Sequence, residues 1–478
     1  MKFWSFSTTV RNPERIRRFL LAFKELEGEK WTHETQSKFQ FLLLQQKLYG
    51  IGNPEFEKTL TPEQLKWLYS ENLTYEQAKN IVLSKNYVGG ADMRGRQSLN
   101  PIKKMGFVYL NDEKQIVITP LGNAFLAEDY DLGDIFFRSL LKWQYPNPDA
   151  NDYPKKDGYN IKPLIATLHL IAKVNKLCSS QHLKEKGVSK TEFAIFFTTL
   201  SNYVNINSTA DALIEFRKEY EAKIGKAEKD AFAKQYFELN CSEYDSWGNA
   251  IDYADNVIRY FRLTRLFYLR GNGFYIDLEP RRKVEIESLL ETDNASALTF
   301  ETKIDYSLYL GDITKPELPW ENITKLQNVI DVLLQDIETA ENELHNKNIS
   351  VPQRPKTVKA DNTKTLKELI ESLRNYRRKL FDIETHAETQ QHENIENCIS
   401  SLQSIFILAE KRPVELERMV ALGLHILNDA IGIKPNYPVG DDNQPTFTAP
   451  ANKPDIECFY QSFNSICEVT MLSNIAKI

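Results

Sequence analysis

Apolar residues recur at helical spacing along most of this chain, beginning near its N-terminus. Asn12, Pro13 and Gly28 delimit the first predicted helix, because asparagine caps helix starts, proline fits the first turn and glycine ends helices. The apolar stripe of this helix consists of Ile16, Phe19, Leu20 and Phe23. The stripe leaves Arg15 and Arg18 off the buried face, where they face either solvent or the phosphates of a nucleic acid.

Two β-rich segments interrupt the helical pattern. In the first, within residues 89–126, the runs GFVYL and QIVIT are joined by NDEK and followed by a Thr-Pro-Leu-Gly helix entry. In the second, within residues 259–278, a helix is predicted to end near Thr264 and a hairpin to turn at Gly271-Asn272-Gly273. A hairpin that follows helices is typical of the wing of a winged-helix DNA-binding module, although wings also serve in protein contacts.

Helical spacing resumes between and beyond the two hairpins. Residues 162–237 read as a long helical stretch, and we interpret Trp143 and Tyr145 as core residues rather than base-stacking ones. Pro316 and Pro319 indicate a linker. Beyond it, the first apolar stripe comprises Leu326, Ile330, Leu333, Ile337, Ala340 and Leu344; the second Leu366, Leu369, Ile370, Leu373 and Leu380; the third Ile395, Ile399, Leu402 and Phe406. These helices predict an antiparallel connector or a dimerising coiled coil.

Composition narrows the possible classes of protein. With 478 residues, 42% of them hydrophobic and 26% charged, the chain is expected to form two or three globular domains. A net charge of -6 argues against a protein that coats polyanions, yet an acidic half can mask a local basic surface. The five cysteines form no CxxC pair, so structural zinc is not expected. Without a signal-like leader or a membrane-length apolar run, we expect a cytoplasmic protein with reduced thiols.

Carboxylates near the C-terminal end carry the candidate chemistry. A Pro-Asp step places Asp455 at the start of one short strand, and Glu468 follows in the strand-like run SICEV. A hairpin of these strands brings the two carboxylates together, and a hard cation such as Mg²⁺ between them relieves their repulsion. This is the logic of a PD-(D/E)xK nuclease, although Thr470 stands where a lysine is common and supplies no positive charge.

A third carboxylate is predicted to come from the preceding helix. Glu417 lies in the segment ELERMVALGLHIL, and Glu415 and Glu457 compete with it for this role. A PD step followed by ExT is weak evidence by itself and also fits a merely structural hairpin.

Several longer blocks carry a resemblance to a known family. They are KFWSFSTTVRNPERI, RGRQSLNPIKKMGFVYLNDEKQIVITPLG, LLKWQYPNP, RYFRLTRLFYLRGN and KPDIECFYQSFNSICEVT. In this order, and spanning nearly the whole chain, they resemble the AlwI-type restriction endonucleases and their nicking relatives. The resemblance implies a type IIS enzyme, in which an N-terminal region recognises a short asymmetric duplex site and a C-terminal domain cleaves outside it with Mg²⁺.

The resemblance also implies roles for individual residues. Asp455, Glu468 and Glu417 match the family's carboxylates and would be the catalytic, metal-binding residues. Arg94 and Arg96 match its Arg-x-Arg stretch and would contact DNA. The other basic residues that we expect at the DNA are Lys103, Lys104, Arg15, Arg18, Arg262 and Arg265. The implied partners are double-stranded DNA, a second copy or a second nuclease subunit for double-strand cleavage, and a cognate DNA methyltransferase, with no membrane.

The expected fold is multidomain α+β. A mostly helical DNA-recognition region with winged-helix-like hairpins spans 1–300, with subdomains of about 1–150 and 151–300. A linker spans 301–325, and 326–478 holds the helical connector and a PD-(D/E)xK-like nuclease core. Relatives continue well beyond the position of Thr470, so we expect this core to be incomplete, as in a truncated product or a recognition half. The alternatives are a catalytically inactive sequence-specific DNA-binding protein and a helical interaction scaffold.

Overall fold

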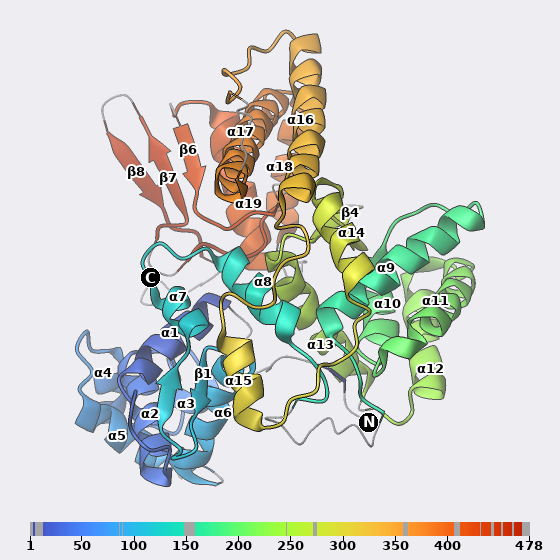
Figure 1. Cartoon of the computed structure of the whole chain (residues 1–478). Coiled ribbons are helices and arrows are strands. Elements are labelled where there is room, and N and C mark those ends of the chain that lie inside the picture. The colour runs from blue at the N-terminus through green and yellow to red at the C-terminus, as the bar shows by residue number, and fades with distance from the viewer. Residues whose placement is uncertain are drawn as a thin grey trace. The chain divides into compact units, whose positions relative to one another are not determined.

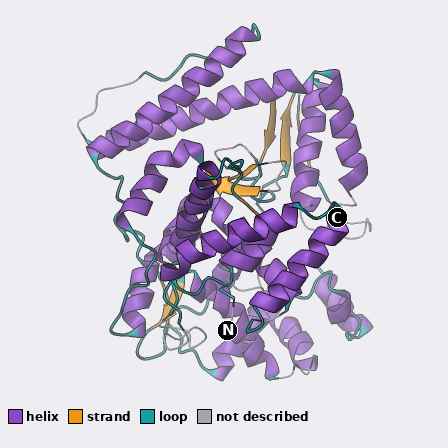
Figure 2. Cartoon of the chain, turned by 90° about the vertical axis from the view of Figure 1, so that its right-hand side faces the viewer, coloured by secondary structure: helices purple, strands orange, loops and turns teal. Residues whose placement is uncertain are grey.

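The structure is a computed structural model of the whole chain. It describes residues 3–4, 13–85, 87, 89–147, 158–244, 246–270, 275–356, 362–405, 412–430, 432–440, 444–450, 453–460 and 463–470. Helices make up most of these residues, and the strands form three small sheets, in agreement with the predicted mostly helical α+β fold (Figure 2). No helix within these ranges is long and apolar enough to cross a bilayer.

The chain divides into two compact units. The first comprises Met1–Thr264, Phe274–Ile276 and Asp293–Glu317, and the second Arg265–Gly273, Asp277–Thr292 and Leu318–Ile478. The main boundary falls inside the linker predicted over 301–325. The first part of that segment is nevertheless helical, because it forms α15 (Lys303–Gly311), which buries Tyr306 and Leu310 within the first unit.

The first unit is built mainly from helices (Figure 1). They are α1 (Pro13–Lys24), α2 (His33–Gln45), α3 (Pro54–Glu57), α4 (Pro62–Tyr69), α5 (Tyr75–Ser84), α6 (Gly90–Lys104), α7 (Pro120–Leu126), α8 (Leu132–Lys142), α9 (Pro163–Ser180), α10 (Lys190–Glu192), η2 (Phe193–Phe197), η3 (Tyr203–Asn205), α11 (Ile206–Glu221), α12 (Gly225–Asn240), α13 (Trp247–Leu263) and α15. Thr61 and Thr74 start α4 and α5 through capping boxes. The stripe predicted for the first helix is buried, as are Trp143 and Tyr145; Asn12 lies outside the described residues.

The first predicted hairpin is confirmed. Strand β1 (Val108–Leu110) pairs antiparallel with β2 (Ile116–Ile118), with Val108 opposite Ile118. The hairpin follows α6 through Gly106, whose φ of 79° suits a residue without a side chain at a helix end. The Thr119 hydroxyl then caps α7 by accepting a hydrogen bond from Gly122 N at 3.0 Å. That this hairpin acts as a wing stays a prediction.

The second predicted hairpin is part of a three-stranded sheet. Its strands are β4 (Phe267–Arg270) and β5 (Tyr275–Leu278), and α13 ends at Leu263 as expected. Strand β5 lies between β4 and β3 (Val188–Ser189), with Val188 opposite Ile276. The predicted turn at Gly271-Asn272-Gly273 lies outside the described residues.

The second unit consists of long helices beside a small sheet. Its elements are η4 (Pro280–Arg282), α14 (Lys283–Thr292), α16 (Ile323–Asn346), α17 (Thr363–Thr389), α18 (His392–Ser404), α19 (Arg412–Leu427), β6 (Gly432–Pro435), β7 (Ile456–Phe459) and β8 (Asn464–Cys467). Leu333, Ile337 and Leu373 belong to the core between α16 and α17, which confirms the two longest predicted stripes. Of the third stripe, Ile399 on α18 is exposed and Ile395 and Leu402 are half-buried, while Phe406 lies outside the described residues.

Candidate active site and DNA-contacting surface

Asp455 and Glu468 lie at the same end of the β7–β8 hairpin. Ile456 is opposite Cys467 in the antiparallel register, so Asp455, one residue before β7, lies across from Glu468, one residue after β8. The backbone N–H of Val469 donates a 2.6 Å hydrogen bond to Asp455 Oδ2, which holds the carboxylate at this end of the hairpin. The hairpin predicted from the sequence therefore forms and brings these two carboxylates together.

Glu417 of α19 reaches the same end of the sheet. Its side chain is 4% exposed, and its Oε2 accepts a 2.9 Å hydrogen bond from the backbone N–H of Ala449. Burial, together with the charges of Asp455 and Glu468, raises the pKa of Glu417 to about 7, although the hydrogen bond from Ala449 N–H acts in the opposite direction. The structure thus gathers all three predicted carboxylates into one electrostatically coupled cluster.

Packing between α19 and the sheet positions this cluster. Ile456 and Cys458 of β7 are buried, and Ala421 of α19 belongs to the same core. Because side chains alternate along a strand, Glu457 lies on the opposite face of β7 from these two buried residues. Ala421 is one helical turn after Glu417, so the contact that buries Ala421 also fixes the height of Glu417 beside the sheet.

The two competing carboxylates are engaged elsewhere. Glu457 Oε2 accepts a 2.7 Å hydrogen bond from Lys434 Nζ on β6, where the two residues are directly opposite in register. This hydrogen bond lowers the pKa of Glu457. Glu415 pairs with Arg418 one turn along α19, at 2.9 Å. Glu417 is the one of these three that lies with Asp455 and Glu468.

The three carboxylates are suitable ligands for a hard divalent cation, but they are too far apart to coordinate one together. Carboxylate oxygens are ligands that Mg²⁺ favours. Within the described ranges, however, no three histidine, cysteine, aspartate or glutamate side chains are arranged so that they could hold a metal ion. Glu417, Asp455 and Glu468 therefore have the right chemistry for the ion, and would have to approach one another more closely to hold it.

The pKa of Glu417 predicts how stability depends on pH. Without divalent ions, we expect the stability of the protein to fall as the pH rises from 4.5 to about 7. In that window the folded protein retains a proton on Glu417 that the unfolded chain has released, so raising the pH favours unfolding. Thermal unfolding midpoints in EDTA across this range test the expectation. Glu417→Gln is expected to flatten the profile, and identical profiles for variant and wild type would contradict the assignment.

The two arginines of α6 interact with residues of that helix and with Tyr87, three residues before its start. Arg94 lies over the ring of Tyr87, at 5.1 Å from its centroid, and donates to Gln97 Oε1 at 3.3 Å. Arg96 is exposed and lies 3.6 Å from Asp92, one turn earlier. Arg96 is therefore the better placed of the two to contact DNA.

The predicted basic residues of α1 differ in their surroundings. Arg15 donates to the carbonyl oxygen of Leu48, and its guanidinium lies 5.5 Å from the centroid of the Phe19 ring. Burial, followed by the neighbouring charge of Arg18, lowers the pKa of Arg15. Arg18 is exposed. Arg15 is exposed as well, so a phosphate contact from α1 is open to both residues, although the Arg15 guanidinium also donates to the protein backbone.

The structure does not support the expectation that Arg262 contacts DNA. It lies in the last turn of α13 and is 6% exposed, so its guanidinium is not presented to a phosphate in this structure. Arg265 follows the end of the helix, where its φ of 60° turns the chain into β4, and it is half-buried.

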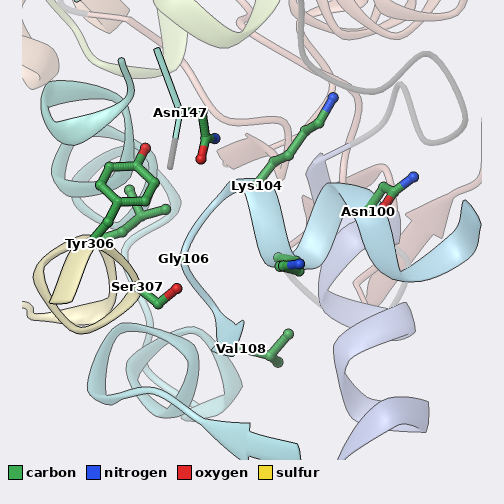
Figure 3. Close-up of a pocket in the computed structure, with 9 residues that line it drawn as sticks. Asn100, Lys104, Gly106, Val108, Asn147, Tyr306 and Ser307 are labelled. Atoms are coloured by element: carbon green, nitrogen blue, oxygen red, sulfur yellow. The ribbon is translucent and has the colours of Figure 1, made fainter. Parts of the chain in front are cut away.

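Lys103 and Lys104 line a small pocket that sequence reasoning missed. The pocket has a volume of about 50 Å³, and Figure 3 shows its walls converging from three parts of the first unit. Its other lining residues are Asn100, Gly106, Val108, Asn147, Tyr306, Ser307 and Leu310. No local pattern joins these positions, because Tyr306 and Ser307 belong to the segment predicted as a linker.

Comparison with known families decides the class of the protein. The family model of the AlwI restriction endonucleases matches residues 103–477, which is more than three quarters of the chain. The chain belongs to the AlwI restriction endonuclease family. The resemblance noted in the sequence is thereby confirmed. The members of this family are restriction endonucleases, a class of enzyme that binds and cuts DNA.

Other comparisons add little to the AlwI assignment. No curated protein sequence matches the chain. One solved structure with some similarity is the binding domain of BpuJ1 endonuclease, crystallised with pyrene- and phenanthrene-modified DNA. Its TM-score is 0.37 at 13% sequence identity, and the match covers 62% of this chain and 90% of that one.

Proposed function

We propose that the chain is a Mg²⁺-dependent type IIS endonuclease that hydrolyses DNA phosphodiester bonds at a distance from a short asymmetric site. The observation that carries this proposal is the gathering of Glu417, Asp455 and Glu468 at one end of the β7–β8 hairpin, in a member of a restriction endonuclease family. The arrangement has the chemistry of a PD-(D/E)xK site, with the acidic pair at the adjacent ends of two strands and a third carboxylate from a helix.

The three carboxylates share one part in the proposed mechanism, as ligands of the metal ion. Asp455, Glu468 and Glu417 would hold the ion, which when bound polarises the scissile phosphate and activates a water molecule for in-line attack. The N–H of Val469 orients Asp455, and Ala449 N–H orients Glu417. Because the pKa of Glu417 is about 7, this group must lose its proton to become a ligand, so metal binding releases a proton and strengthens as the pH rises.

The partners of the proposed enzyme follow from its class. Double-stranded DNA is the substrate, and a cognate DNA methyltransferase protects the host's own sites. A second copy, or a second nuclease subunit, cuts the other strand; without one, the enzyme nicks. Arg96, Arg18 and the lysines of α6 are the basic residues that we assign to the DNA.

A second candidate is sequence-specific DNA binding without cleavage. Two observations favour it: Thr470 occupies the position where a lysine is common, and the three carboxylates are not spaced to hold an ion. Such a protein would serve as a recognition subunit.

One experiment separates these candidates. Duplexes that bind the protein in EDTA are selected from a random pool, and a plasmid that carries the selected sequence is then incubated with the protein and Mg²⁺. We expect one enriched motif, and scission at a fixed distance from it. A motif without scission supports the recognition subunit. If no duplex sequence is enriched even at low salt, both candidate functions are contradicted.

A further inference from the structure

The pocket at the end of α6 is rich in hydrogen-bond donors. Lys103 and Lys104 contribute two positive charges, Asn100 and Asn147 two amides, and Ser307 a hydroxyl. None of its nine lining residues is acidic. In Figure 3, Lys104 and Asn100 rise from α6, while Asn147 and the ring of Tyr306 occupy the opposite wall. A site with this charge and these donors selects an anion rather than a cation.

The size of the pocket limits what the anion can be. A single water molecule needs about 10–15 Å³ on the same measure of volume. A pocket of about 50 Å³ therefore holds a group of a few non-hydrogen atoms, which fits a phosphate and is too small for a nucleobase.

The pocket has a rigid frame. At Gly106 an added Cβ would lie 2.7 Å from the carbonyl oxygen of Leu310, so the segment between α6 and β1 approaches α15 closely here. At Gly95 it would lie 1.9 Å from the carbonyl oxygen of Gln36, so α6 is also packed tightly on α2. With its frame fixed on both sides, the pocket is preorganised and binding requires little reordering of the backbone.

The outer face of α6 leads into the pocket. Arg96, Asn100, Lys103 and Lys104 follow three-four spacing and are exposed or half-buried, whereas Ser98, Leu99 and Ile102 on the other side are buried. Arginine and asparagine are residue types that read guanine and adenine edges, and lysines at a fixed point hold the backbone beside them.

We propose that this pocket binds one phosphate of the DNA backbone and so fixes the register of α6 on the duplex. This inference rests on the proposed function, because it takes the duplex as the ligand. Lys103 and Lys104 supply the charge, Asn100, Asn147 and Ser307 the further donors, and the contact carries no sequence information of its own.

The test neutralises single phosphates in the DNA and removes both pocket lysines from the full-length protein. Duplexes of the selected sequence, each with one methylphosphonate, are bound in EDTA to wild type and to Lys103→Ala/Lys104→Ala. At one position we expect the neutral linkage to weaken wild-type binding about tenfold or more, and to have little further effect on the variant. The variant should weaken binding to all sequences alike and reduce the salt slope of log K by about 1.

A control variant tests whether the effect is specific to the pocket. Lys24→Ala/Lys66→Ala removes two exposed lysines of the same unit outside the pocket, and should retain the full methylphosphonate effect. If every methylphosphonate weakens the Lys103→Ala/Lys104→Ala variant as much as the wild type, the pocket does not bind a phosphate, while the proposed function stands. If the wild type binds no duplex, the proposed function fails and this inference fails with it.

Discussion

Replacing Asp455 with asparagine is expected to reduce DNA cleavage at least about 10³-fold, while DNA binding in EDTA is unchanged. A catalytic metal ion contributes several kcal/mol of transition-state stabilisation, and each 1.4 kcal/mol is worth about tenfold in rate. The amide lacks the negative charge that holds the ion, yet its oxygen can still accept the hydrogen bond from Val469 N–H. The fold of the hairpin should therefore survive the substitution.

A neighbouring carboxylate provides the matched control for Asp455. Glu457 lies two residues further along, at the second position of the same strand, and is paired with Lys434. Glu457→Gln is expected to change the cleavage rate by less than tenfold, because this group lies outside the proposed metal site. Rates are measured by plasmid nicking and linearisation at saturating protein. If the Asp455→Asn variant cuts DNA at the wild-type rate, the carboxylate cluster has no part in the mechanism.

Local sequence was sufficient to predict the acidic pair. The Pro-Asp step, the short apolar strands and their spacing predict a hairpin, and antiparallel register then places Asp455 across from Glu468. Glu417 needed the family resemblance, because its burial depends on Ala449 and on packing between α19 and the sheet. Contacts between segments this far apart in the chain produce no local sequence pattern from which they could be predicted.

The same limit explains the errors at basic residues. Near the end of α13 the helix is buried all round, since Tyr260, Phe261 and Leu263 are buried together with Arg262. When only the residue type is considered, a charged residue in such a turn is predicted to be exposed. The phosphate pocket was missed for a related reason. Its lysines were predicted to contact DNA, but the wall formed by α15 comes from a segment whose prolines indicated a linker.

A buried ion pair gives the largest expected effect on stability. Arg217 of α11 and Glu192 have side chains 4% and 5% exposed, and Arg217 donates to Glu192 Oε1 at 2.6 Å and Oε2 at 3.0 Å. Arg217 also donates to the carbonyl oxygen of Gly187 at 2.6 Å. Arg217→Met leaves Glu192 buried without its counter-charge, so we expect a loss of about 3–5 kcal/mol in the free energy of unfolding.

The next residue, Lys218, forms an ion pair that is exposed to solvent and serves as the control. Lys218 pairs with Glu215 at 2.8 Å on the exposed face of α11, where the side chains are 46% and 67% exposed. Solvent screens this pair, so Lys218→Met is expected to cost less than about 1 kcal/mol. Urea unfolding of both variants measures the difference. Water can solvate the charge that remains when an exposed pair loses its partner, but it cannot solvate a charge that remains buried. Equal losses of stability in the two variants would therefore mean that the Arg217 pair is as accessible to water as the Lys218 pair.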